Sequence, residues 1–210
     1  MLVVVVVVGI IVSSAACARA PSSSVTHAVY GGYDARRFAA DEISIYPRGA
    51  RLGYVIGRSD TPYSGFIEGG YAQAQTIDFS ILSLGIGGRV AAVRHQRFEL
   101  GALASLGFQG ARFDDRMNGN SLLAIGVGGY AHVRVHARVA LTVTASAHAF
   151  ADVTPPTTCN DGSTSQSTGQ GTCSHHDGIA FYNEMIGAGT GLDALLGLSI
   201  SLGAGARASQ

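Results

Sequence analysis

The chain has 210 residues and no lysine, and its 14 arginines balance 14 aspartates and glutamates, so the formal net charge is zero. This balance excludes the strongly basic composition of most nucleic-acid-binding domains, and we expect no nucleic-acid partner. The length fits one domain of ordinary size.

The amino terminus has the composition of an export signal. Residues 2–12 form an unbroken apolar run, which is too short to span a bilayer as a helix but suits the hydrophobic region of a signal peptide. Small residues precede Cys17 and resemble the lipobox of bacterial lipoproteins, which makes Cys17 the lipidation candidate. Ordinary cleavage after Ala16 or Ala20 is the alternative. We therefore expect a signal peptide over residues 1–20 and export of the mature chain.

Residues 21–49 show no clear hydrophobic period and begin with a proline and three serines. The sequence predicts an irregular tether here, with short strands or packing elements at most near residues 30–33 and 43–46. The β-barrel domain is expected over residues 50–210.

From residue 51 onward, apolar residues alternate with small or polar ones. Successive side chains on a strand point to opposite sides, so a period of two predicts strands with two unlike faces. Tight connections at residues 95–96, 136–137 and 193–194 make neighbouring strands antiparallel. We expect eight strands, at about 51–58, 64–75, 79–93, 97–112, 121–135, 138–152, 179–192 and 196–207.

The residue types on the two faces favour a membrane barrel. The less apolar face carries mainly Gly, Ser, Ala and Thr, which suits the narrow lumen of a barrel of about eight strands. On the strand near residues 98–108, the apolar face begins at Phe98 and ends at Phe108. Ten residues tilted by about 40° rise about 25 Å, the height of the lipid-facing band of such barrels. The sequence thus predicts an all-β, antiparallel up-and-down barrel with membrane lipid as its partner; a soluble barrel or sandwich is the alternative.

The expected strands leave a conflict over the loops. Outer-membrane barrels normally keep both termini in the periplasm and place their long loops outside. With eight strands from residue 51, the long segments 114–120 and 153–178 would face the periplasm. Either a strand near residues 43–46 has been missed and another miscounted, or the protein departs from the usual arrangement.

Two cysteines lie fourteen positions apart in the longest polar segment of the chain. Cys159 and Cys173 are the disulfide candidates. A disulfide that closes a loop of this size could stabilise the fold by about 3 kcal/mol if the geometry permits. Such a bond persists in an oxidising compartment, which agrees with export. Two unpaired thiols are the alternative.

The sequence offers little for catalysis. The His-His-Asp run at residues 175–177 contains metal-ligand types, but adjacent histidines on a polar loop are more often solvated. Ser146, His148 and Asp152 share one strand face, yet residues strung along one strand rarely converge as a hydrolase triad requires. We expect no catalytic, cofactor-binding or metal site, and no cofactor.

Several charged or titratable residues fall in the register of the small side chains. Charges in a narrow lumen must pair to offset their desolvation, so we expect a polar network that plugs the barrel. The functional alternative is a proton-binding or ion-conducting lumen. The residues of the expected network are Arg89, Glu99, His132, Arg134, His148 and Asp152.

This exported, Gly-rich chain with about eight alternating strands resembles the small outer-membrane β-barrel proteins of Gram-negative bacteria. The resemblance covers residues 51–207 and is compositional; the chain lacks the terminal aromatic residue usual in that class and ends in Ser209-Gln210. It implies an outer-membrane location but not one function, because such barrels serve as anchors, adhesins, narrow pores or lipid-modifying enzymes. We expect a non-enzymatic barrel with a structural or surface-interaction role. The alternative is an exported soluble or lipid-tethered barrel, periplasmic in location, that binds a small apolar ligand.

Overall fold

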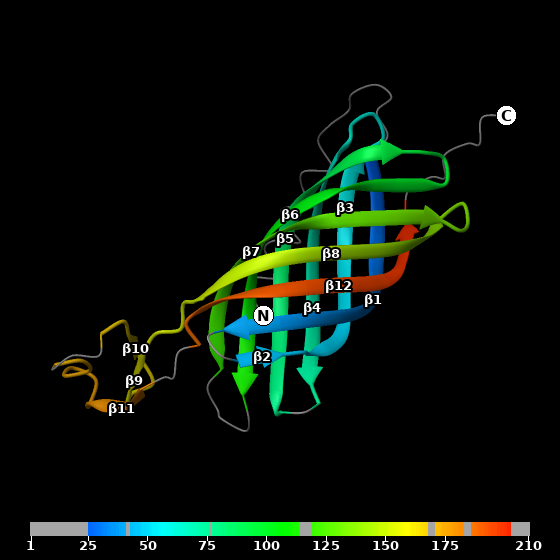
Figure 1. Cartoon of the computed structure of the whole chain (residues 1–210). Helices are drawn as coiled ribbons and strands as arrows, with labels where there is room; N and C mark the ends of the chain where they lie inside the picture. The colour runs from blue at the N-terminus through cyan, green and yellow to red at the C-terminus, as the bar shows by residue number, and fades with distance from the viewer. Residues whose placement is uncertain are drawn as a thin grey trace.

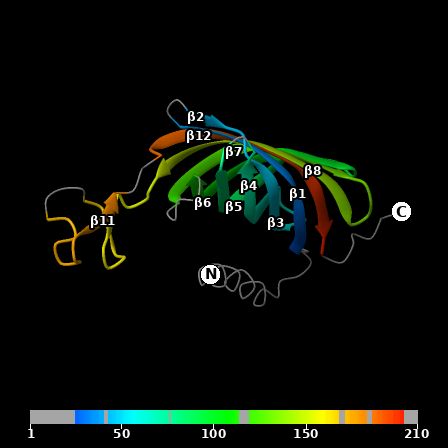
Figure 2. The ribbon, with the colours of Figure 1, turned by 90° about the horizontal axis from the view of Figure 1, so that it is seen from below.

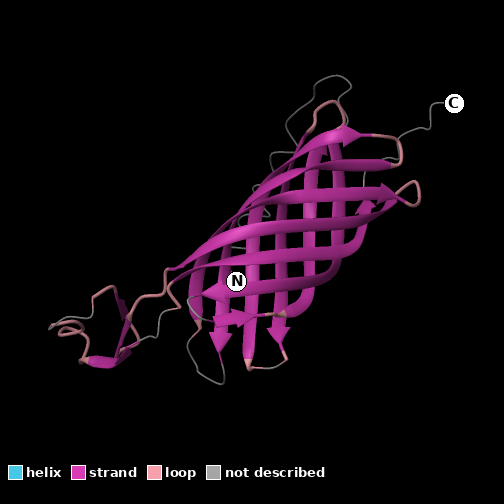
Figure 3. Cartoon of the chain, viewed as in Figure 1, coloured by secondary structure: helices cyan, strands magenta, loops and turns pink. Residues whose placement is uncertain are grey.

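The computed structural model describes residues 25–40, 43–75, 77–113, 119–167, 171–182 and 186–202. The regular structure of these residues is β-strand throughout (Figure 3). None of the described residues form a helix long and apolar enough to cross a membrane. The predicted signal peptide at residues 1–20 and the lipidation candidate Cys17 lie outside the described residues.

Eight long strands form a closed antiparallel barrel (Figure 1). Each of the first seven pairs with its neighbour in chain order, and β12 closes the barrel by pairing with both β8 and β1. The all-β, up-and-down barrel predicted from the sequence is therefore confirmed. The barrel strands are β1 (Val25–Ala40), β3 (Arg48–Arg58), β4 (Tyr63–Ala74), β5 (Phe79–Arg94), β6 (Phe98–Phe113), β7 (Asn120–Arg134), β8 (Val139–Asp152) and β12 (Ala188–Ser201).

Directly paired residues can be followed from strand to strand around the barrel. One full circuit returns to β1 ten residues beyond its starting point. The circuit runs through Val29, Tyr54, Ile67, Ile86, Leu106, Ile125, Ala149, Thr190 and Ala39. With about 3.3 Å per residue and eight strands, this offset corresponds to a strand tilt of about 40°. A barrel of this size has an interior just wide enough for side chains, which explains the small residues on the inner face.

The two faces of each strand lie as the alternation predicts. On β5, Leu82 and Ile86 point outward and are 65% and 50% exposed, whereas the inward-facing Arg89 is 4% exposed. On β6, Leu106 and Phe108 likewise lie on the outside. An outer surface covered with exposed apolar side chains fits lipid and not water as its surroundings.

The two ends of the barrel differ in their connections. At the turn end, β1 begins, β12 ends, and three short turns join the strands at 59–62, 95–97 and 135–138. At the loop end, the longest connection joins β8 to β12 over residues 153–187. The other loop-end connections are 41–47, 75–78 and 114–119.

Two sequence predictions are wrong, and together they explain the conflict over the loops. Residues 25–40, expected within an irregular tether, form β1. The strands expected at 179–192 and 196–207 are largely one strand, β12, in which Asp193 pairs with Arg36 instead of forming a turn. The number of strands stays at eight, but every later connection moves to the opposite end. The long segments therefore lie away from the start of β1 and the end of β12, as is usual in outer-membrane barrels.

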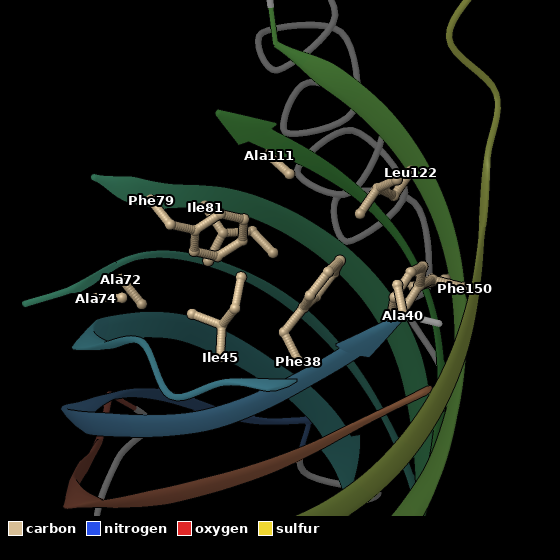
Figure 4. Close-up of a cluster of buried hydrophobic side chains, with 11 residues drawn as sticks. Phe38, Ala40, Ile45, Ala72, Ala74, Phe79, Ile81, Ala111, Leu122 and Phe150 are labelled. Carbon is tan, nitrogen blue, oxygen red and sulfur yellow. The ribbon is translucent and has the colours of Figure 1, made fainter. Parts of the chain in front are cut away.

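An apolar cluster fills the loop end of the lumen (Figure 4). The short strand β2 (Ile43–Ile45) pairs with the end of β1 and brings Ile45 into this cluster. The ring of Phe38 stacks on that of Phe150 at 4.3 Å between centroids and lies 5.4 Å from the ring of Phe79. The cluster, termed the apolar plug below, comprises Phe38, Ala40, Ile45, Ala72, Ala74, Phe79, Ile81, Ala111, Leu122, Ala124 and Phe150.

Candidate functional site in the lumen and at the loop end

Arg51 on β3 is the centre of a buried ion-pair network in the lumen. Its Nη2 lies 2.6 Å from Oδ1 of Asp34 and 3.2 Å from Oδ2 of Asp193, and its Nη1 lies 3.2 Å from Oε1 of Glu68. Arg36 brings a second cation to Asp34, with Nε 2.6 Å from Oδ2. The side chain of Asp34 is fully buried and that of Arg51 is 6% exposed, so mutual pairing has to replace the lost hydration.

Hydrogen bonds extend this network along the lumen. The hydroxyl of Tyr30 donates to Oε2 of Glu68 at 2.5 Å, and Nη2 of Arg36 donates to Oγ of Ser83 at 2.8 Å. Together with the contacts of Arg51, these bonds join residues of five strands, β1, β3, β4, β5 and β12, across the interior. Such cross-links hold the barrel strands in one register.

A second group surrounds Arg89 on β5. Its guanidinium carbon lies 4.8 Å from the ring centroids of both Tyr30 and Phe66, and 5.4 Å from that of Tyr130. Its Nη1 lies 3.5 Å from Nε2 of His132. Aromatic ring faces attract a buried guanidinium, so these rings contribute to stabilising the positive charge inside the barrel.

A third group connects the lumen to the turn end. The hydroxyl of Tyr130 donates to Oε1 of Glu99 at 2.8 Å, and Nε of Arg94 donates to Oε2 of Glu99 at 2.9 Å. The side chains of Arg94 and Glu99 are 39% and 31% exposed. Contacts between polar side chains therefore run from the turn-end surface through Tyr130, Arg89 and Tyr30 to the network around Arg51.

The structure divides the six residues that the sequence placed in one network. Four of them point into the lumen: Arg89, Glu99, His132 and His148. Arg134 is exposed at the turn end. Asp152 lies at the loop end, where its carboxylate accepts a hydrogen bond from Asn120 at 2.8 Å. The hydrolase alternative gains no support: the Asp152 carboxylate accepts hydrogen bonds from Asn120 and from loop backbone, whereas Nδ1 of His148 lies 3.6 Å from Oδ2 of Asp193.

The residues at the centre of the network were not predicted from the sequence. Tyr30, Asp34 and Arg36 lie in the segment expected to be a tether, and Asp193 lies at an expected turn. One signal was available, since Tyr30, Asp34, Arg36 and Phe38 occupy positions two or four apart and share one strand face. That face carries large and charged residues, so it did not match the alternation between apolar and small residues seen in later strands.

The connection at residues 153–187, termed the loop-end module, contains a small sheet of its own. Its strands β9 (Thr157–Cys159), β10 (Thr164–Ser165) and β11 (Ile179–Tyr182) pair in the order β10-β9-β11. The module projects from the barrel beyond the ends of β8 and β12 in both views (Figures 1 and 2). The structure joins the predicted pair Cys159 and Cys173 in a disulfide, with Cα atoms 5.5 Å apart. That separation is typical of disulfides.

Asp152 fastens both stems of the module to the barrel rim. Its Oδ1 accepts from the backbone N–H of Thr154 at 2.8 Å, and its Oδ2 accepts from that of Ile186 at 2.7 Å. The N–H of Ser121 on β7 donates to Oγ1 of Thr154 at 2.7 Å. These bonds fix where the module leaves the barrel.

Asp161 organises the polar surface of the module. Its Oδ1 accepts from both the N–H and the hydroxyl of Ser163, at 2.9 and 2.7 Å, and its Oδ2 lies 2.6 Å from Nδ1 of His176. The hydrogen bonds from Ser163 contribute most, and that from His176 contributes less, to lowering the pKa of Asp161 from 3.8 to about 2. Across the described residues, no three His, Cys, Asp or Glu side chains are placed to hold a metal ion.

The low pKa of Asp161 predicts acid sensitivity of the module. The unfolded carboxyl binds protons at higher pH than the folded one, so the stabilisation is complete above pH 3.8 and is lost as the pH falls toward 2. We expect the amide of Ser163 to lose protection from hydrogen exchange over that range, whereas Asp161→Asn should remove this pH step. Equal protection of Ser163 at pH 5 and pH 2 in the unmodified protein would contradict the prediction.

Comparisons with known proteins separate the module from the barrel. Residues 154–182 match a family model described as "Domain of unknown function (DUF3761)", which covers the greater part of the module and none of the barrel strands. No curated protein sequence matches the chain.

The barrel is similar to solved structures at low sequence identity. Neisserial surface protein A superposes with a TM-score of 0.56 at 11% identity, covering 84% of this chain and 98% of that chain. A major outer membrane protein from Thermus thermophilus superposes with a TM-score of 0.50 at 10% identity, covering 85% and 100%. The chain thus has the fold of small bacterial outer-membrane β-barrels, as the sequence resemblance implied.

Proposed function

We propose that this chain is a non-enzymatic outer-membrane β-barrel protein that displays the loop-end module at the cell surface. The observation that carries the proposal is the position of the module, at the end of the barrel away from the start of β1 and the end of β12. Barrels of this kind normally keep both strand termini on the periplasmic side, so the module would face outward. The description of the Thermus thermophilus neighbour as an outer membrane protein supports this location.

The filled lumen favours a role for the barrel as a scaffold for the module over a role in transport. The apolar plug occupies the loop end, and the ion pairs around Arg51 occupy the middle. A lumen filled with packed and paired side chains gives the strands a rigid frame but leaves little space for a solute.

The module has the features of a recognition unit. It matches a family model that excludes the barrel strands, it is closed by a disulfide, and its exposed side chains include Asp161, His175 and His176. Export by the signal peptide at residues 1–20 and acylation of Cys17 remain predictions.

Membrane insertion and orientation can be tested together. Expressed at full length in a Gram-negative host, the protein is expected in the outer-membrane fraction, as a band whose mobility in detergent gels shifts on boiling. An epitope inserted between Gln166 and Ser167 of the module should be reached by antibody on intact cells. The same epitope inserted in the turn at residues 59–60 is the matched control and should stay protected until the cells are opened.

Two results would count against the proposal. Release of the protein into the soluble periplasmic fraction would favour the soluble barrel that binds an apolar ligand. Antibody access to the turn epitope but not to the module epitope would reverse the orientation.

A further inference from the structure

A cavity of about 50 Å³, measured as space open to the centres of water molecules, lies in the lumen. It touches both the network around Arg51 and the group around Arg89. Its lining also includes Gln109 of β6, His148 of β8 and Asp193 of β12.

Five buried side-chain nitrogen or oxygen atoms in the described part of the protein lack a hydrogen-bond partner, and all five belong to residues that line this cavity. They are Nε of Arg51, Nε of Arg89, Oε1 of Gln109, Nδ1 of His148 and Oδ1 of Asp193. The residues Arg51, Arg89 and Gln109 are at most 6% exposed. An unpaired buried polar group is destabilising, so five of them around one space indicate that something polar occupies it.

The chemistry of these atoms selects the occupant. Two are N–H donors on cations, at Arg51 and Arg89, while Gln109 and Asp193 offer acceptor oxygens. An anion would be repelled by Asp193, and a metal cation would be repelled by the arginines. Water donates and accepts, and a cavity with about 50 Å³ open to water centres has room for it.

We propose that this cavity is a buried water site, and that its water exchanges with bulk solvent through the turn end of the barrel. Polar side chains lead from the cavity at Arg89 past Tyr130 to Glu99 at the turn-end surface. In the opposite direction the lumen is closed by the apolar plug. The lumen thus contains water that reaches solvent at the turn end and is closed off at the loop end. This inference does not depend on what the loop-end module binds.

Radiolytic hydroxyl-radical footprinting of the full-length protein in lipid nanodiscs tests this inference, because bound water generates radicals next to buried side chains. Phe66 lines the cavity and Tyr130 lies on the route to the turn end, whereas Phe150 belongs to the plug; all three are at most 6% exposed. After correction for intrinsic reactivity, Phe66 and Tyr130 should be oxidised several-fold faster than Phe150. Oxidation of Phe66 as slow as that of Phe150 would overturn the water site, and oxidation of Phe66 without Tyr130 would overturn the turn-end route.

A substitution provides the matched control. Gln109→Leu places an apolar side chain against the cavity and should reduce the oxidation of Phe66 at least twofold. Gln73→Leu, on the exposed outer face of β4, should leave it unchanged. Equal oxidation of Phe66 in both variants would contradict the proposal, and the wild-type comparison stands even where a variant fails to fold.

Discussion

Replacement of Arg51 with methionine is expected to lower the free energy of unfolding by about 3–5 kcal/mol. The guanidinium of Arg51 contacts the carboxylates of Asp34, Glu68 and Asp193 at 2.6–3.2 Å. Its removal leaves Asp34 with Arg36 as its cation, and leaves the partly buried Glu68 and Asp193 without their arginine. A buried carboxylate without its partner carries its full desolvation cost, which methionine cannot offset.

The loss can be measured by urea unfolding in lipid vesicles, with the boiling-dependent gel shift as the folded-state signal. Arg58→Met is the matched control, because Arg58 pairs with Asp60 at 2.9 Å but both side chains are about half exposed. An exposed pair is worth about 0–1 kcal/mol, so this variant should unfold almost as the wild type does. Similar losses in both variants would show that the network around Arg51 is not the principal cross-link of the barrel.

A double variant separates charge from packing. If the loss in Arg51→Met comes from the unpaired acids, adding Asp193→Asn should recover part of the stability, since it removes a charge that Arg51 paired and leaves the pair of Arg36 with Asp34 intact. If the loss comes from a packing defect, the second substitution should add to the damage. The same urea titration measures the recovery, as the difference in free energy of unfolding between the single and the double variant.

The disulfide variant Cys159→Ser with Cys173→Ser is expected to destabilise the loop-end module by about 3 kcal/mol while the barrel stays folded. The module has three strands of two to four residues, too short to be stable by their hydrogen bonds. Cys159 and Cys173 are among the few buried apolar side chains described in this segment, at 2% and 6% exposure. The cross-link therefore supplies much of what holds the module closed.

Hydrogen exchange measures this loss in the membrane-bound protein. The amide of Cys159 bonds to the carbonyl of Ser163, and that of Asn160 bonds to the carbonyl of Gly178. Both amides should exchange about a hundredfold faster in the disulfide variant, which is the factor that about 3 kcal/mol implies. Amides in the ladder between β5 and β6 serve as the internal control and should keep their protection. Unchanged protection at Cys159 and Asn160 would mean that the stems at Asp152 suffice to order the module.

Barrel and module thus depend on different interactions. The barrel is held by the strand ladder and by buried charge pairs such as Arg51 with Asp34, whereas the module is held by one covalent bond and by surface hydrogen bonds around Asp161. The module can therefore open without the barrel unfolding. Under the proposed function, a loss of surface recognition in the disulfide variant with an intact gel shift would assign that recognition to the module.

The alternation of residue types was sufficient to predict the architecture and the direction of most side chains. Leu82 and Ile86 point outward and Arg89 points inward, as a period of two requires. The disulfide candidates and the tight turns near residues 95 and 136 also followed from local features. These features depend on a few neighbouring residues, so they are visible without knowledge of the fold.

The first strand and the centre of the lumen could be found only in the tertiary structure. Residues 25–40 become a strand because β12, from the far end of the sequence, pairs along them and closes the barrel. Closure then brings Asp193 to Arg51 and Asp34, in contacts that no spacing along the chain encodes. A strand with charged inward-facing residues is stable only where those charges pair with opposite charges across the lumen. Which residues face each other there depends on the register in which the barrel closes.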